Sequence, residues 1–110
     1  MEQLIYTSFK CKIKLSYQEL MALNDMLGRV RYEENMNLTR KARALAMMEY
    51  AIKKRMEFTR KLMDRKGVNS FTLNALESFM FALLFAEIIE ANPYEANIKD
   101  KIINAIYKQL

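Results

Sequence analysis

Hydrophobic and polar residues alternate along the first part of the chain, from Ile5 to Leu15. Side chains on a β-strand point to opposite faces in turn, so this alternation predicts a half-buried strand. A strand cannot satisfy its backbone hydrogen bonds alone, so it needs a partner strand in the same chain or in another subunit. The apolar face carries Ile5, Thr7, Phe9, Cys11, Ile13 and Leu15, and the basic face carries Tyr6, Ser8, Lys10, Lys12 and Lys14.

The segment after this strand changes to a helical spacing of three and four residues between apolar positions. Ser16 and Glu19 have the spacing of a capping box, in which each side chain accepts a hydrogen bond from the other residue's backbone N–H. A first helix is therefore predicted from Tyr17 to about Arg31. Gly28 lies inside this pattern and is the alternative end of the helix.

A long second helix is predicted from about Thr39 to Lys66, with Gly67 as its stop signal. Met47 and Phe58 lie outside its main apolar stripe and also suit a helix that packs on two sides, including across a dimer. The stripe predicted to face the core consists of Leu38, Leu45, Met48, Ile52, Met56, Thr59 and Met63.

The second half of the chain repeats these signals. Residues 68–73 have the composition of a short strand, and Asn74 then begins a second capping box. The helix predicted from there to about Ala91 is apolar all round at Phe79–Ala86, so it lies either in the centre of the core or half buried in another subunit. Pro93 suits the first position of a last helix, where its missing N–H costs nothing.

Together these elements predict one domain, residues 1–110, with a mainly helical α+β fold. It contains an N-terminal strand, a candidate second short strand and a four-helix bundle-like core. The strand-to-helix junctions at Leu15–Glu19 and Leu73–Glu77 lie 58 residues apart. The similarity of the two junctions has two explanations. One is duplication of a strand–helix–helix unit, and the other is that strand-to-helix junctions commonly carry a capping box.

The composition argues against most enzymes. The 110 residues are 52% hydrophobic, which is typical of a globular chain, and they contain no histidine, one cysteine and two glycines. No histidine base, thiolate metal site or glycine-rich phosphate loop can be built from them, so we expect no catalysis, cofactor or metal. Glu87 and Glu90, with Glu77 further up the helix, remain an alternative oxygen-ligand site for Mg²⁺. Pairing of these carboxylates with lysine or arginine is the favoured interpretation.

The positive charge is concentrated in the first part of the chain. Residues 1–67 hold 15 Lys/Arg against 8 Asp/Glu, whereas residues 68–110 hold 3 against 5. This distribution favours a polyanionic partner or charge-complementary self-association. On the long helix, cations with interleaved aromatic residues form one sector, which suits phosphates and bases but also a solvated helix face. The candidate nucleic-acid-binding residues are Lys10, Lys12, Lys14, Arg40, Arg43, Lys54, Lys61 and Arg65.

A basic strand, a Ser-capped helix and a further helix follow one another in residues 8–55, carried by the strand lysines, the Leu15–Ser16 junction and apolar positions 20, 23 and 27. This order resembles that of the ribbon-helix-helix DNA-binding proteins. The resemblance implies that the strands of two subunits pair and that their outer side chains enter the major groove. The chain departs from the family in its long helix connection, its longer second helix and its two further helices. Lysines on an edge strand also protect against aggregation.

The expected function is that of a non-catalytic oligomeric interaction or adaptor protein, because the strand lacks a partner and the third helix is fully apolar. A nucleic-acid-binding module is the alternative. We expect a cytoplasmic homodimer or higher oligomer without a membrane partner, which binds itself, DNA, RNA or an acidic protein surface. The predicted interface residues are Phe9, Cys11, Ile13, Phe79, Phe81, Leu84 and Phe85.

Overall fold

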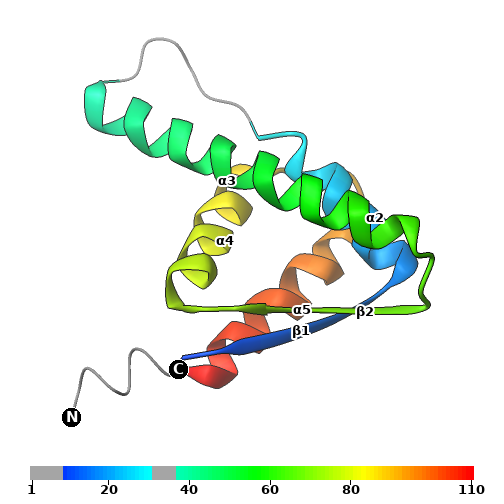
Figure 1. Ribbon diagram of the computed structural model, residues 1–110. Coiled ribbons are helices and arrows are strands. Elements are labelled where there is room, and N and C mark those ends of the chain that lie inside the picture. Colours follow the sequence, from blue (N-terminus) through cyan, green and yellow to red (C-terminus); the bar gives the residue numbers. More distant parts are fainter. Residues whose placement is uncertain (1–8, 31–36) are drawn as a thin grey trace.

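The computed structural model describes residues 9–30 and 37–110, which form two strands and four helices. This arrangement confirms the mainly helical α+β class and the second strand. In Figure 1 the small sheet lies at the bottom of the molecule and α3 runs across the top, while the last turns of α5 lie beside β1. The elements are β1 (Cys11–Ser16), α2 (Tyr17–Leu27), α3 (Leu38–Met63), β2 (Val68–Leu73), α4 (Ala75–Glu87) and α5 (Pro93–Gln109).

The two strands pair with each other in antiparallel orientation, with Ile13 opposite Phe71. Cys11, Ile13 and Leu15 are buried and the residues between them are exposed, so the predicted alternation is confirmed for this part of the strand. Its earlier part, including Ile5, lies outside the described residues. Pairing within the chain replaces the pairing across a dimer that the ribbon-helix-helix resemblance implied.

The chain runs through the order strand, helix, helix twice. Both strand-to-helix junctions form the predicted capping boxes, one between Ser16 and Glu19 and one between Asn74 and Glu77. The helices of the two halves interlock, because α2 packs against α5 and α3 packs against α4. The strand pair therefore rests on helices from both halves, which share one core.

The ends of α2 and α3 differ by a few residues from the predicted ends. Helix α2 ends at Leu27, and the cap is the alternative position Gly28, beside which the Arg55 guanidinium lies too close for a Cβ atom. Helix α3 is capped by Asn37 and begins at Leu38, one residue before the predicted start at Thr39. It ends before the predicted glycine, and Arg65 takes the left-handed conformation with φ 52°.

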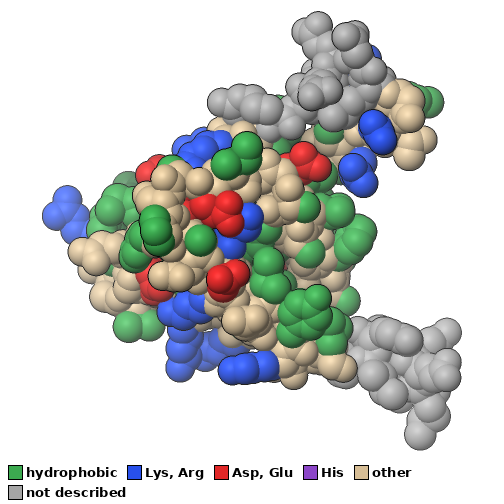
Figure 2. Space-filling view, turned by 180° about the vertical axis from the view of Figure 1, so that it is seen from behind, with side chains coloured by type: hydrophobic (Ala, Val, Ile, Leu, Met, Phe, Trp, Pro, Cys, Tyr) green, Lys and Arg blue, Asp and Glu red, His purple; other side chains and the backbone are tan. Residues whose placement is uncertain are grey.

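Helix α4 is half buried within the chain. Phe81, Leu84 and Phe85 pack in the core, whereas Leu76 and Phe79 are exposed. Figure 2 shows hydrophobic side chains gathered on the surface over this helix, on the right of that view. One side of the apolar helix α4 therefore packs in the core, and the other side forms an apolar surface.

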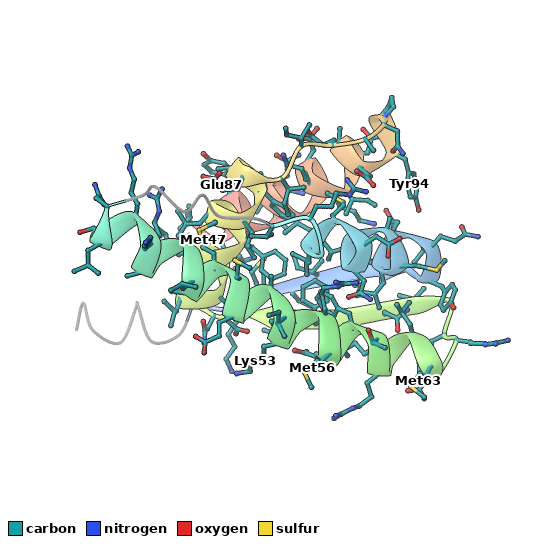
Figure 3. The ribbon with its side chains drawn as sticks, turned by 90° about the horizontal axis from the view of Figure 1, so that it is seen from above. Met47, Lys53, Met56, Met63, Glu87 and Tyr94 are labelled. Carbon is teal, nitrogen blue, oxygen red and sulfur yellow. The ribbon has the colours of Figure 1, made fainter. Side chains whose placement is uncertain are left out.

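The predicted orientation of α3 is wrong. The side chains of Leu38, Leu45, Ile52, Met56 and Met63, which were predicted to face the core, are between 51% and 84% exposed. The helix is turned so that Phe58 packs on Phe71 with ring centroids 4.9 Å apart, and Phe71 stacks in turn on Phe81. In Figure 3, Met47 points toward α4, while Met56 and Met63 point away from the rest of the molecule. The residues of α3 that are buried are Met47, Ala51, Lys54 and Phe58.

Candidate nucleic-acid interface

The outer face of the β1–β2 pair is exposed and polar. Lys12 lies opposite Thr72, and Lys14 lies opposite Ser70. All four residues are exposed, as is Lys10 just before β1. Lysine ammonium groups donate hydrogen bonds, and the hydroxyl groups both donate and accept them. This face, which we call the ribbon face, therefore presents positive charge and hydroxyls without a carboxylate of its own.

Further cations flank the ribbon face on both sides. Along β1, a groove of about 550 Å³ separates the strand from α5. Beside β2, the Lys61 Nζ donates a hydrogen bond to the Ser70 carbonyl oxygen at 3.1 Å. Figure 2 shows lysine and arginine side chains along the lower edge of the molecule, where the sheet lies. The groove is lined by Lys12, Ile13, Lys14, Lys101, Asn104, Ala105, Lys108 and Gln109.

Most of this positive charge is not neutralised by neighbours. Lys101 pairs with Glu19 at 3.1 Å. Partial burial works against ionisation of Glu19, but the Ser16 N–H and Lys101 outweigh it and lower the pKa of this carboxyl. Lys12, Lys14 and Lys108 make no ion pair with any residue that the structure describes. Their charges remain available to an anionic ligand.

The candidate cations on α3 separate into three groups. Lys54 is buried and bonded to Glu57 and Glu77, each at 3.1 Å, so it is not available to a phosphate. Lys61 lies in the last turn of α3 and bonds to β2 beside the ribbon face, and Arg65 lies between the end of α3 and β2.

Arg40 and Arg43 belong to the opposite end of α3. At a rise of 1.5 Å per residue, Arg43 lies about 27 Å from Lys61 along the helix. The structure therefore brings Lys61 close to the strand lysines and separates them from Arg40 and Arg43.

Buried charge on the inner face of α3 is held by a small polar network. The Tyr50 hydroxyl donates a hydrogen bond to the same Glu77 oxygen that Lys54 contacts. Burial, followed by the charge of Glu77, raises the pKa of Tyr50. Partial burial opposes ionisation of Glu77, but the Asn74 N–H and Lys54 lower its pKa overall. This network satisfies a cation that would otherwise be costly to bury.

Sequence reasoning missed two cations of this site, Lys101 and Lys108. They lie seven residues apart on α5, so they share one side of that helix. This spacing was visible in the sequence, but the packing of α5 beside β1 was not. Only the long-range placement of α5 shows that this side of the helix continues the ribbon face.

The predicted interface residues are mostly in the core. Phe9 is half buried, and Phe79 is exposed. A separate apolar groove of about 400 Å³ runs between α4 and α5, lined in part by Phe85 and Ile106. The buried members of the predicted interface are Cys11, Ile13, Phe81, Leu84 and Phe85.

The carboxylates considered for Mg²⁺ are dispersed. Glu90 pairs with Lys99 at 3.1 Å, Glu77 belongs to the network with Lys54, and Glu87 is exposed. Within residues 9–30 and 37–110, no three His, Cys, Asp or Glu residues are grouped so that they could hold a metal ion.

Comparison with protein-family models, with curated proteins and with solved structures found no match to this chain. In the part of the chain that the structure describes, no helix has the length and apolar character needed to cross a bilayer. The arguments on function that follow therefore rest on the geometry and charge of the molecule.

Proposed function

We propose that this chain binds nucleic acid through its ribbon face. The observation that carries the proposal is the pairing of Lys12 and Lys14 with Thr72 and Ser70 on one exposed face of a two-stranded ribbon. The major groove of B-DNA, about 12 Å wide, admits such a ribbon, and lysine and hydroxyl side chains are suited to base edges and phosphates. Helices α2, α4 and α5 pack against the strands, and Phe58 of α3 packs on Phe71 of β2.

The surrounding charge supports the same function. Lys61 lies beside β2, and Lys101 and Lys108 lie across the groove from β1. A ligand seated on the ribbon would bring its phosphates toward these side chains. Phosphate contacts of this kind supply most of the sequence-independent affinity for nucleic acid and set the register of the protein on it.

The resemblance to ribbon-helix-helix proteins supports this proposal in a modified form. In that family, two subunits supply one strand each to the ribbon. Here β1 and β2 of one chain supply both strands, and each is followed by two helices. A single chain would then offer the surface for which that family uses a dimer.

Fluorescence anisotropy with labelled duplex DNA and RNA, measured over a salt series, tests this proposal. The double substitution Lys12→Glu with Lys14→Glu should abolish binding. The matched double substitution Arg40→Glu with Arg43→Glu changes the net charge equally but lies far from the ribbon, so it should weaken binding only slightly. For duplex DNA, the affinity should fall by about 0.9 decades per decade of salt for each phosphate contacted.

Two results would contradict the proposal. Absence of binding to both nucleic acids at low salt would remove nucleic-acid binding altogether. Equal losses in the two double variants would mean that net charge, and not the ribbon face, determines the affinity.

An oligomeric interaction protein is the second candidate function. Phe79 is 60% exposed, and the apolar groove between α4 and α5 lies on the same helix, where another copy or a partner can bury apolar surface. Light scattering at low and high salt tests it, with Phe79→Asp as the variant. A mass above that of the monomer, lowered by Phe79→Asp, is the expected result, and a monomer at every concentration and salt would remove this candidate.

A further inference from the structure

We infer that the ribbon face recognises base pairs of B-form duplex DNA in one orientation, with guanines on the DNA strand that lies nearer β1. This inference rests on the proposed function and names its ligand. The two strands of the ribbon differ in chemistry, because β1 presents Lys12 and Lys14 whereas β2 presents Ser70 and Thr72. A ribbon built from two identical subunits would present the same side chains on both strands. A ribbon with two different strands suits a DNA site without two-fold symmetry.

The outward side chains of the ribbon favour duplex DNA over other nucleic acids. These side chains belong to Lys12, Lys14, Ser16, Val68, Ser70 and Thr72. None of the six is aromatic, so they offer no ring on which unpaired bases could stack. The major groove of A-form RNA is too deep and narrow for side chains to reach the bases, whereas that of B-DNA admits a two-stranded ribbon. A B-form duplex is therefore the ligand that matches this face.

Each lysine of β1 lies opposite a hydroxyl of β2. Lys12 faces Thr72, and Lys14 faces Ser70. The Cβ atoms of such opposite residues are about 5 Å apart, so the two side chains can reach the two bases of one base pair. Guanine presents the acceptors N7 and O6, to which a lysine ammonium donates, and cytosine presents an amino group, from which a hydroxyl accepts. The order of lysine and hydroxyl therefore matches a G·C pair with guanine on the β1 side.

The spacing of the two lysines sets the spacing of the two guanines. Lys12 and Lys14 are two residues apart, which is about 6.8 Å along an antiparallel strand. Nucleotides follow one another at about 3.4 Å along each DNA strand. The lysines therefore match guanines two positions apart, and both guanines belong to the same DNA strand because both lysines belong to β1.

The β1 side of the ribbon is strongly cationic. The groove between β1 and α5 is lined by four lysines and by no carboxylate. Glu19 reaches Lys101 at 3.1 Å and neutralises it in part, but Lys108 has no such partner among the described residues. Asp100 lies about 100° away from Lys101 around α5 and does not line the groove. The DNA backbone beside β1 therefore meets a surface that attracts phosphates.

The β2 side of the ribbon is less cationic. Lys61 lies beside β2, but it shares a surface hollow of about 590 Å³ with Glu57 and Asp64. Phosphate contacts fix the orientation of a protein on a duplex. Unequal contacts on the two sides of the ribbon therefore favour one orientation of the chain on an asymmetric site.

Selection of binding sequences from a library of randomised duplexes tests the inference on the full chain. The enriched sequences should share guanines two positions apart on one strand and should not be palindromic. Fluorescence anisotropy then compares a duplex of this sequence with one in which both G·C pairs are reversed to C·G. Reversal should weaken binding at least about tenfold, because each well-made base contact discriminates by about that factor. Duplex RNA of the same sequence should show no such preference.

Matched variants locate the residues that recognise the bases. Lys12→Gln with Lys14→Gln should move the preference from guanine to adenine at the same positions, because a glutamine amide pairs with N6 and N7 of adenine. Lys101→Gln with Lys108→Gln removes the same charge, but it should weaken binding to all duplexes alike and retain the guanine preference. A change of preference cannot result from unfolding.

Several outcomes would overturn the inference. Salt-sensitive binding that enriches no sequence would overturn it and leave the proposed function intact, whereas absence of binding would remove both. Palindromic enriched sequences would contradict recognition in one orientation. A folded Lys12→Gln with Lys14→Gln variant that keeps the guanine preference, or that binds no duplex at low salt, would mean that these lysines do not recognise bases.

Discussion

The inner and outer faces of α3 carry large apolar residues in similar numbers, yet only the inner face is buried in the core. On the inner face, Met47 and Phe58 are buried against the other elements. On the outer face, Ile52 and Met56 are exposed. The inner face also buries a lysine, which the outer face does not. Apolar content alone therefore did not decide which face entered the core; the partners available on the other elements did.

The aromatic residues explain this choice. Phe58 meets Phe71 of β2, Phe71 stacks on Phe81 of α4, and Tyr50 meets Phe81 edge to face. Such ring pairs add about 0.5–1.5 kcal/mol each beyond the burial of their surface. With Ile52 turned inward instead, these contacts would be lost, and Phe58 would be exposed to water.

The largest expected difference between the two faces concerns stability. Phe58→Ala should lower the free energy of unfolding by about 3–5 kcal/mol, because it leaves a cavity among the aromatic rings. Ile52→Ala should change it by less than about 0.5 kcal/mol, because the side chain is already in water. Chemical denaturation of both variants measures the difference. A large loss in Ile52→Ala would mean that the outer face is covered in solution.

An intermediate effect is expected at the buried lysine. Lys54→Ala removes the ammonium that Glu57 and Glu77 share, and it should lower the free energy of unfolding by about 1–3 kcal/mol. Lys53→Ala, on the neighbouring exposed position, should be neutral within about 0.5 kcal/mol. Denaturation curves measure both variants. Equal losses of unfolding free energy would show that the buried Lys54 contributes no more to stability than the exposed Lys53.

The same network predicts a smaller, pH-dependent effect. Because the pKa of Glu77 is lowered in the folded chain, the unfolded chain takes up the proton at a higher pH than the folded chain. Stability from this group is therefore complete above its ordinary pKa of about 4.3 and is lost as the pH falls through the folded pKa. Glu77→Gln should flatten the decline in unfolding free energy over this range. Equal slopes in the wild-type chain and Glu77→Gln would contradict the assignment.

The smallest effect on stability should come from oxidation of the outer face. Dilute peroxide should convert Met56 and Met63 to sulfoxides, while Met47, which is 4% exposed, reacts only when the chain opens. Peptide mass spectrometry measures the three rates, and the melting temperature should not change after Met56 and Met63 have reacted. Fast oxidation of Met47 would show that the inner face is not packed in solution.

Local signals in the sequence predicted most of the elements. The alternation around Cys11–Leu15, the two capping boxes and Pro93 at the start of α5 all act within a few residues, so a single sequence displays them. The predicted end of α3 at Gly67 was wrong, because a left-handed turn at Arg65 ends the helix earlier. The candidate site was predicted in part: the strand lysines are exposed as expected, but Lys54 is not.

Local signals were sufficient to predict which segments become strands and helices, because propensity, periodicity and capping depend on residues close together in the chain. Tertiary structure alone decided that β1 pairs with β2, that α3 turns Phe58 inward and that Lys101 and Lys108 lie beside the ribbon. These outcomes depend on contacts between residues far apart in the chain. When a helix has two apolar faces, only its contacts with the rest of the core determine which face is buried.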